Sequence, residues 1–321
     1  MHLSRNRSLS STSNPAKIAV LLLAHGSPDS IDEVPEFLLQ VTGGRSLSAL
    51  VIEELKRRYQ LIGRSPLTEL TLKQAELLAR ELRLPVYVGM RNWKPFIADA
   101  VRSMTADGVK RAAAICLAPQ NSRTSVGLYR SALASENGIP FAIDFVESWH
   151  DHPLLIQAFA EKLRAGWQGA CREMGAKVPV IFTAHSVPQR TIAEGGDPYE
   201  SQAKETAALV AREAALTPED WVFAFQSQSL SGGAWLGPTV EATILELKQK
   251  GHRGVFVQPI GFLCDHVEVL YDIDTGFKQF AEKEGMRLWR AESLNDSPLL
   301  VAALADVARS RLSKPSAQRV L

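Results

Sequence analysis

The sequence predicts an α/β protein with two similar, doubly wound parallel-sheet lobes and a cleft between them. Short, continuous apolar runs alternate with amphipathic stretches, as buried parallel strands alternate with helices. Four short markers also occur twice along the chain in the same order. Such a repeat indicates two half-chains of one topology, and the divergence between the halves is typical of a pseudo-dimer.

The first marker places a histidine after a buried run in each half: Ala24-His25-Gly26 is matched by Ala184-His185-Ser186. The others are a tryptophan before a proline, a hydrophobic run ending in proline, and a Glu-Ser pair followed by a proline. These pairs are 93–95 with 235–238, Pro119 with Pro259, and 147–153 with 292–298.

We expect four strands per half, because eight apolar runs are short enough for strands and too regular for loops. The runs are 17–24, 85–90, 111–118, 140–147, 178–184, 221–227, 253–260 and 287–293. One helix has a clear start signal, Ser65 as N-cap and Pro66 as first helical residue, and runs on to Leu82.

The boundary between the lobes is predicted near 165–177, where Gly166, Gly169 and Gly175 interrupt a polar run. The predicted units are therefore a disordered tail (1–17), an N-terminal lobe (18–165) and a C-terminal lobe (178–312). The tail is Ser-rich, basic and free of acids. A transit peptide has a similar composition, but we expect a frayed tail.

Composition excludes several classes of protein. A net charge of +1 over 321 residues gives no electrostatic case for nucleic acid. Three cysteines lie far apart with no CxxC pair, which argues against a disulfide framework, a zinc knuckle or an iron–sulfur site. No apolar run approaches the ~20 residues of a membrane span. We therefore expect a cytoplasmic protein.

The histidines mark a candidate site, because ligands of such sheets bind at the carboxyl ends of the strands. The third marker of the second half leads into a segment that ends at Glu268, so His185 and Glu268 should face one cleft. An imidazole and a carboxylate can ligate a divalent metal or move protons. If 266–275 is helical, Glu268 and Asp272 share a face, and Asp274 extends a line of acids toward solvent.

Plainer interpretations remain open beside this one. A lone histidine after a strand is more often structural, and Glu268 with Asp272 could be a solvated helix face. Other residues have expected structural roles: Asp265 as a helix N-cap, Cys264 as a small buried hydrophobe, and Trp93 and Trp235 as core or lobe-packing residues. Patterns for dinucleotide binding, a P-loop or a nucleophile elbow are not present.

Two stretches carry a specific pattern: Gly261-Phe262 through Asp265-His266-Val267-Glu268 to Asp272, and Thr183-Ala184-His185-Ser186. They resemble ferrochelatase, the enzyme family that inserts Fe(II) into a porphyrin to make heme. Further matching stretches are 58–59, 65–67, 95–101, 117–119, 125–129, 146–149, 196–199 and 235–238. The resemblance covers about 18–312 and is nearest the soluble bacterial branch, whose members often act on coproporphyrin III.

The resemblance implies roles for matching residues. His185 and Glu268 would meet the metal or take pyrrole protons, with Asp272 as a further metal candidate. Porphyrin contacts would come from His25, Arg45, Arg58, Tyr59, Ser65 and Tyr129. The enzyme would need no cofactor beyond its substrate Fe(II), and the absence of a later cysteine cluster excludes the iron–sulfur branch.

The chain also departs from the family pattern. His25 stands where relatives carry tyrosine or methionine, so it could bind iron axially. Only Arg45 remains of a more basic stretch, which weakens the case for coproporphyrin III against protoporphyrin IX. Gly276 replaces an acid found in some relatives, so an outer metal site is not expected.

Two other functions remain as alternatives. One is a cobalt or nickel chelatase of sirohydrochlorin, and the other is a non-catalytic porphyrin or heme carrier. The expected partners are porphyrin and ferrous iron, without nucleic acid, in a monomer or weak oligomer. The apolar residues of 29–50 have two possible roles: they could contact a membrane surface, or they could form the buried face of a helix.

Overall fold

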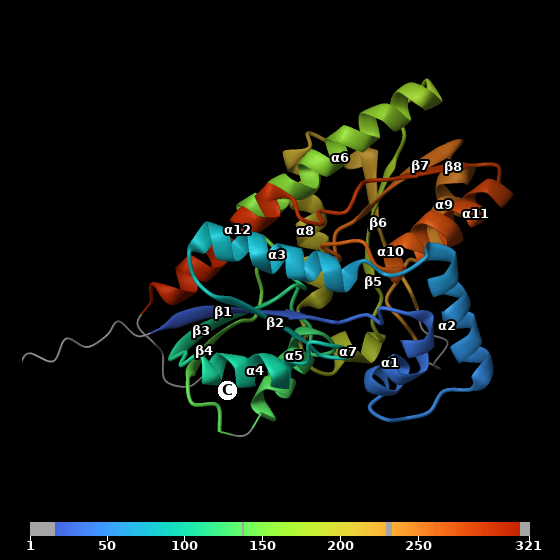
Figure 1. The fold of residues 1–321 in the computed structure, drawn as a ribbon. Helices are drawn as coiled ribbons and strands as arrows, with labels where there is room; N and C mark the ends of the chain where they lie inside the picture. Colours follow the sequence, from blue (N-terminus) through green and yellow to red (C-terminus); the bar gives the residue numbers. More distant parts are fainter. Residues whose placement is uncertain (1–16, 137, 229–232, 315–321) are drawn as a thin grey trace, which may run out of the picture.

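The computed structural model describes residues 17–136, 138–228 and 233–314, so the predicted tail, apart from Lys17, lies outside the described residues. Two four-stranded parallel sheets form the lobes, with strand orders β2-β1-β3-β4 and β6-β5-β7-β8 (Figure 1). The first sheet contains β1 (Ile18–Ala24), β2 (Val86–Met90), β3 (Arg111–Cys116) and β4 (Ala142–Val146). The second contains β5 (Val180–His185), β6 (Trp221–Gln226), β7 (Gly254–Pro259) and β8 (Arg287–Arg290).

All eight predicted strands are confirmed, and the two sheets have the same order, as the repeated markers predict. Strand β1 shows why unbroken apolar runs predicted these strands. Its neighbours β2 and β3 both run parallel to it. Its consecutive residues Leu21 and Leu22 are both fully buried, on opposite faces of the sheet. A strand covered on both sides requires an unbroken apolar run.

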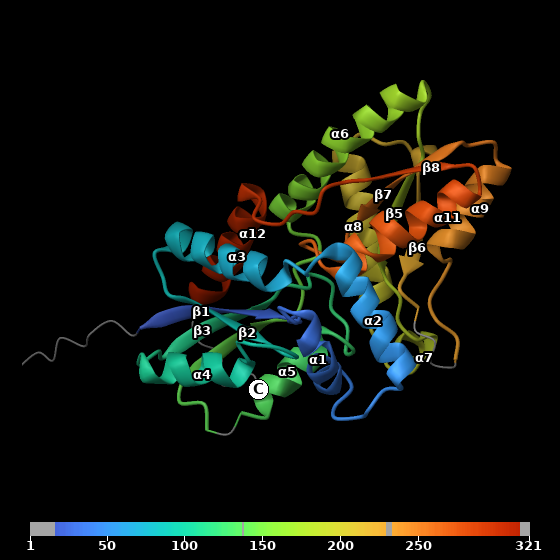
Figure 2. The same cartoon turned by 45° about the vertical axis from the view of Figure 1, so that its right-hand side comes forward.

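Helices cover both faces of each sheet. The first half of the chain contains α1 (Val34–Val41), α2 (Ala49–Ile62), α3 (Leu67–Leu82), α4 (Ile97–Ala106), α5 (Val126–Ala134) and α6 (Pro153–Met174). In the second half they are α7 (Gln189–Ala193), α8 (Tyr199–Glu213), α9 (Val240–Gln249), α10 (Val267–Leu270), α11 (Lys278–Lys283) and α12 (Pro298–Leu312). Short 3-10 turns are η1 (Ile31–Glu33) and η2 (Pro218–Asp220), and η3 (Asp272–Phe277) is a π-helix. Figure 2 shows α3 and α12 on one side of the first sheet and α4 on the other.

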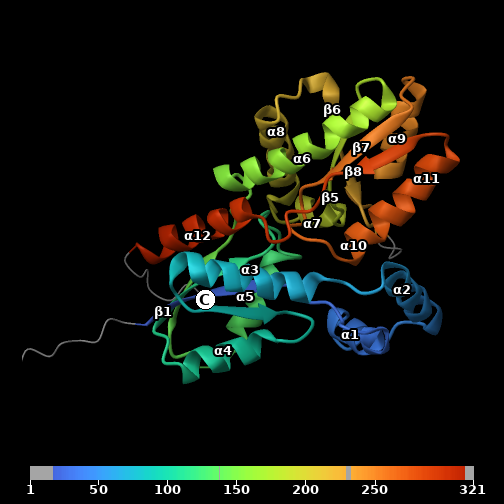
Figure 3. The same cartoon turned by 45° about the horizontal axis from the view of Figure 1, so that its top comes forward.

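The last helix of each half packs on the sheet of the other half. Helix α6 follows β4 but packs on β7 and β8, whereas α12 follows β8 and packs on β3 and β4. The two helices also contact each other (Figure 3). One continuous hydrophobic core extends through both lobes. Each lobe therefore contains a helix from the other half of the chain.

The boundary predicted at 165–177 consequently falls largely inside α6, which continues through Gly166 and Gly169. A Cβ on Gly166 would lie 2.8 Å from Cζ of Phe256. This glycine allows the helix to approach β7 closely and does not end it. Within the described residues, no helix combines the length and apolar character needed to cross a bilayer.

Two helical segments differ from the prediction. Helix α3 begins at Leu67 with Pro66 as N-cap, one residue later than the Ser65 signal predicts. The predicted helix over 266–275 divides into α10 and the π-helix η3, and His266 is the N-cap of α10. Asp265 is not the cap: its carboxylate accepts hydrogen bonds from Ser293 and Asn295.

Arg111 on β3 ties α12 to the first sheet. Its guanidinium donates to Oδ2 of Asp144 at 2.5 Å and to the carbonyl oxygens of Arg311 and Leu312 at 3.0 and 3.1 Å. The Arg111 guanidinium therefore supplies hydrogen-bond donors to carbonyls at the C-terminal end of α12 that have no partner within the helix. Its positive charge is also favoured there by the helix dipole.

We predict that Arg111→Leu lowers the free energy of unfolding by about 3 kcal/mol, because it leaves Asp144 without its partner and the α12 carbonyls unsatisfied. Urea denaturation would measure this loss. The control is Arg80→Leu, which breaks an exposed pair with Glu76 and should cost below about 1 kcal/mol. Equal losses in the two variants would contradict the role assigned to Arg111.

Candidate active site

The two repeated histidines lie at the carboxyl ends of their sheets, and their rings are oriented in the same way. Nδ1 of His25 lies 3.0 Å from the carbonyl oxygen of Gly26, and Nδ1 of His185 lies 2.5 Å from that of Ser186. A carbonyl only accepts, so Nδ1–H is the donor in both rings. In each neutral imidazole, Nε2 therefore keeps its lone pair, as in metal-binding and proton-accepting histidines.

Gly26 makes the turn at His25 possible. Its φ is +88°, and a Cβ there would lie 2.8 Å from the backbone nitrogen of Trp93. Trp93 is fully buried and packs edge-on against Phe37, which packs edge-on against the His25 ring. The expected core role of Trp93 is confirmed, and that core supports the His25 ring.

The structure brings His185 and Glu268 together, although 83 positions separate them. Glu268 lies in the first turn of α10, and its Oε2 is 3.8 Å from Nε2 of His185. Both side chains remain about one-third exposed, so a ligand can reach them. In the part of the chain that the structure describes, no group of three His, Cys, Asp or Glu side chains could hold a metal ion.

A cavity of about 600 Å³ lies between the lobes, and both histidines and Glu268 line it. Of the predicted porphyrin contacts, His25, Arg58, Tyr59 and Tyr129 also line it. Two predicted contacts do not line it. Ser65 is buried beside the start of α3, and Arg45 is exposed in the loop after α1.

Burial and neighbouring charges set the protonation of this cavity. Burial lowers the pKa of His25 and of His266, which favours their neutral forms. Burial alone would raise the pKa of Glu268, but His185, His266, His25 and Arg58 outweigh it and lower that pKa. Glu268 is therefore an ionised carboxylate at neutral pH.

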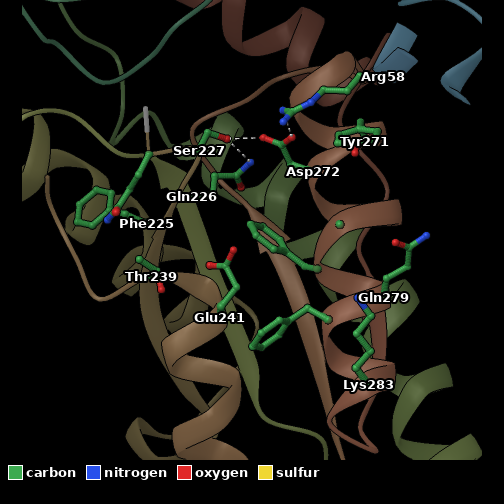
Figure 4. Close-up of a pocket in the computed structure, with 14 residues that line it drawn as sticks. Arg58, Phe225, Gln226, Ser227, Thr239, Glu241, Tyr271, Asp272, Gln279 and Lys283 are labelled. Carbon is green, nitrogen blue, oxygen red and sulfur yellow. Dashed lines mark hydrogen bonds and ion pairs between the residues drawn. The ribbon is translucent and has the colours of Figure 1, made fainter. Parts of the chain in front are cut away.

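A second, outer cavity of about 430 Å³ lies beside the π-helix η3 (Figure 4). Arg58, Ser227, Gln228 and Asp272 line both cavities and so form the wall between them. Within this wall, Ser227 donates to Asp272 at 2.6 Å, and Arg58 pairs with Asp272 at 3.5 Å.

The predicted line of acids ends at Asp272. Asp274 lines neither cavity and accepts two hydrogen bonds from Arg290, at 2.7 and 2.9 Å. Asp274 lies six residues after Glu268, a spacing that does not put two side chains on one helix face. It pairs instead with Arg290.

Sequence reasoning missed several residues of the cavity wall. Arg91 follows β2 and lies over the ring of Tyr129, 5.8 Å from its centroid, and His266 packs edge-on against Phe262. Trp235 is half-buried and lines the cavity between the lobes, so it lies outside the core, and its alternative role in lobe packing stays a prediction. Cys264 is buried as expected. The strand-end rule could have identified Arg91, because it occupies the same edge as His25.

Comparisons with known proteins agree with this geometry. The ferrochelatase family model matches residues 17–312. The chain is 55% identical to a ferrochelatase of Acidobacterium capsulatum, over 93% of this chain and 95% of that one. It is 36% identical to a coproporphyrin III ferrochelatase of a Geobacillus species, over 92% and 98% of the two chains.

The fold also resembles solved chelatases. The sirohydrochlorin chelatase SirB from Bacillus subtilis subspecies spizizenii, in complex with cobalt, matches with a TM-score of 0.58 and 11% identity. The matched regions cover 94% of this chain and 98% of SirB. At that identity the likeness concerns the fold alone.

We predict that Asp272 makes stability depend on pH. Burial raises its pKa to about 6 from an ordinary 3.8, so the folded protein loses stability as pH rises between these values and the buried carboxyl ionises. Asp272→Asn does not titrate. Its stability relative to the parent should rise by up to about 3 kcal/mol between pH 4 and pH 7.

Urea denaturation of both proteins across this pH range measures the difference. Asp306→Asn, at an exposed aspartate paired with His152, is the control and should show a smaller change. A difference between Asp272→Asn and the parent that does not vary with pH would contradict the raised pKa.

Proposed function

This chain belongs to the ferrochelatase family and inserts ferrous iron into a porphyrin in heme biosynthesis, and we propose that His185 and Glu268 carry out the chemistry. Insertion replaces two pyrrole protons by one Fe(II), so the enzyme must accept protons at the ring. The observation that carries the proposal is the His185–Glu268 pair at the cavity wall, with 3.8 Å between Nε2 and Oε2.

The orientation of the His185 ring supports this role. Because Nδ1–H is held by the Ser186 carbonyl, Nε2 is the atom free to take a pyrrole proton. Glu268 is ionised and lies next to Nε2, so its negative charge stabilises the imidazolium that forms. His25, a neutral imidazole on the same cavity, is a candidate axial ligand for the inserted iron.

The rest of the cavity binds the ring. Its walls are mainly apolar, and they include Phe37, Leu38, Leu55, Phe262, Leu263 and Val267. Binding a ring that is bent out of plane would favour the metallation transition state over the flat substrate. Tyr59, Tyr129 and Trp235 also line the cavity, and each combines an aromatic ring with one polar group.

Two arginines of the cavity suit propionate groups. Arg58 is already paired with Glu54 and Asp272, whereas Arg91 has no carboxylate partner among the described residues. We propose that Arg91 pairs with a propionate and that coproporphyrin III is the preferred substrate. The Geobacillus relative named as a coproporphyrin III ferrochelatase supports this choice. Protoporphyrin IX is the alternative.

The other functions have less support. Likeness to SirB concerns the fold alone, and sirohydrochlorin carries more carboxylates than two cavity arginines suit. A carrier needs an axial ligand but not the His185–Glu268 proton acceptor. We propose that the enzyme works in the cytoplasm as a monomer or weak oligomer, without nucleic acid, an iron–sulfur cluster or a cofactor beyond its iron substrate.

Peripheral membrane contact through 29–50 also stays a proposal. Phe37 and Leu38 of α1 are buried, which fits the alternative of a buried helix face. Leu39, Val41 and Leu50 are exposed, and they are the residues available for such contact.

We predict that His185→Ala abolishes Fe(II) insertion while porphyrin still binds, because the proton acceptor is lost and the apolar walls remain. Glu268→Gln should lower turnover by about 10²-fold or more with little change in porphyrin affinity. Anaerobic insertion followed by absorbance, and porphyrin titration by fluorescence quenching, measure the two quantities. His252→Ala, away from both cavities, is the control. Full activity of His185→Ala would rule out this mechanism.

We predict faster Fe(II) insertion into coproporphyrin III than into protoporphyrin IX, and none into sirohydrochlorin. Arg91→Leu should raise the KM for coproporphyrin III about tenfold or more, through loss of a charge-assisted hydrogen bond. The surface variant Arg253→Leu is the control. An unchanged KM in Arg91→Leu would remove this residue from propionate binding, and a preference for protoporphyrin IX would reverse the substrate assignment.

A further inference from the structure

Asp197 is a buried carboxylate that joins the two lobes beside the cavity. Its side chain is 8% exposed and lies just before α8. Oδ1 accepts from the backbone nitrogen of Tyr199 at 3.0 Å. Oδ2 accepts from the backbone nitrogen of Arg123 at 2.7 Å and from Oγ of Ser122 at 3.0 Å. Two of its three donors therefore come from the other lobe.

The segment that supplies these donors, 119–125, is here called the interlobe loop. It connects β3 to α5, and its residues Gln120, Ser122, Thr124 and Ser125 line the cavity. Four further bonds hold it to the C-terminal lobe. Asn121 donates to Gln202 at 2.7 Å, and the Arg123 guanidinium donates to the carbonyl of Arg190 at 3.1 Å. The Gln120 amide donates to Thr206 and to the carbonyl of Ile260, both at 3.1 Å. The loop is thus a wall of the cavity that is fixed from the opposite lobe.

On its other side, Asp197 connects to His185. The Tyr199 backbone is held by Asp197, and the Tyr199 hydroxyl donates to the backbone oxygen of His185 at 2.8 Å. Tyr199 also lines the cavity. Asp197 is therefore bonded directly to one wall and, through a single side chain, to the turn that carries the proposed proton acceptor.

An aspartate just before a helix most often stabilises only that helix, through a bond to a first-turn N–H. Asp197 stabilises α8 in this way through Oδ1. Oδ2 makes no bond to α8 and accepts only from the interlobe loop. Its two donors lie 74 and 75 positions earlier in the chain. A carboxylate acceptor makes each of these hydrogen bonds stronger than one between neutral groups.

We propose that Asp197 is a positioning residue for iron insertion, which sets the distance between the interlobe loop and His185 and so the shape imposed on the bound ring. This inference rests on the proposed function of the cavity. Loss of the carboxylate would let the two walls separate, and the ring would lie flatter and farther from Nε2 of His185. A shift of about 1 Å at a reacting group can cost about 10²-fold in rate.

The test compares Asp197→Asn with Asp220→Asn. Asp220 is also 8% exposed and bonded to a backbone nitrogen, that of Thr217, and to Lys177, but it lines neither cavity. The asparagine at 197 cannot accept from both sides, so we expect kcat for Fe(II) insertion to fall about 10- to 100-fold. Asp220→Asn should stay within about twofold of the parent.

Resonance Raman spectra of bound coproporphyrin III provide a readout that a purely structural role would not move. The out-of-plane ring bands should weaken in Asp197→Asn and stay unchanged in Asp220→Asn. Circular dichroism and thermal unfolding verify that both variants fold. If Asp197→Asn does not fold, Ser122→Ala removes one of the three bonds and should weaken the same bands with a smaller fall in kcat.

Unchanged Raman bands and kcat in Asp197→Asn, or an equal effect of Asp220→Asn, would overturn the inference. So would unchanged bands in Ser122→Ala if that variant has to be used. Failure of the proposed function is a separate result: the unsubstituted protein would then insert no iron into either porphyrin. The ring bands of the bound porphyrin would still decide the role of Asp197.

Discussion

The cleft depends on the shared hydrophobic core created when α6 and α12 pack on each other's sheets. Because each of these helices completes the lobe of the other half, the lobes cannot separate without exposing apolar surface of both. Arg111 reinforces the exchange at the end of α12. A cavity between two such lobes rests on a shared core, which gives its walls the support that a binding site requires.

The same packing places the strands' contribution to the cavity at their carboxyl ends. The strands are buried on both faces, so their polar side chains reach the cavity where the strands stop. His25, His185 and Arg91 all follow this rule. Backbone carbonyls orient both histidine rings, and burial keeps His25 neutral while neighbouring cations and histidines keep Glu268 ionised.

The sequence was sufficient for the strands, the repeated topology and the meeting of His185 with Glu268, because each rests on local pattern or on the repeat. It was insufficient where the structure depends on contacts distant in sequence. Gly166 lies inside α6 at a close contact with Phe256, and Asp274 pairs with Arg290. Arg91 and Asp197 belong to no repeated marker, and their partners Tyr129 and Ser122 become neighbours only in the folded chain.

The near-symmetry of the two histidines has a consequence for how the cavity can work. A chain with identical halves would offer the same base twice, and nothing would distinguish one imidazole from the other. Here the segment that follows Pro259 carries Glu268, whereas the segment that follows Pro119 contains no acid through Val126. Divergence of the two halves has thus paired one imidazole with a carboxylate and left its counterpart without an acid in the corresponding segment, so the two histidines are chemically distinct although their rings are held in the same way.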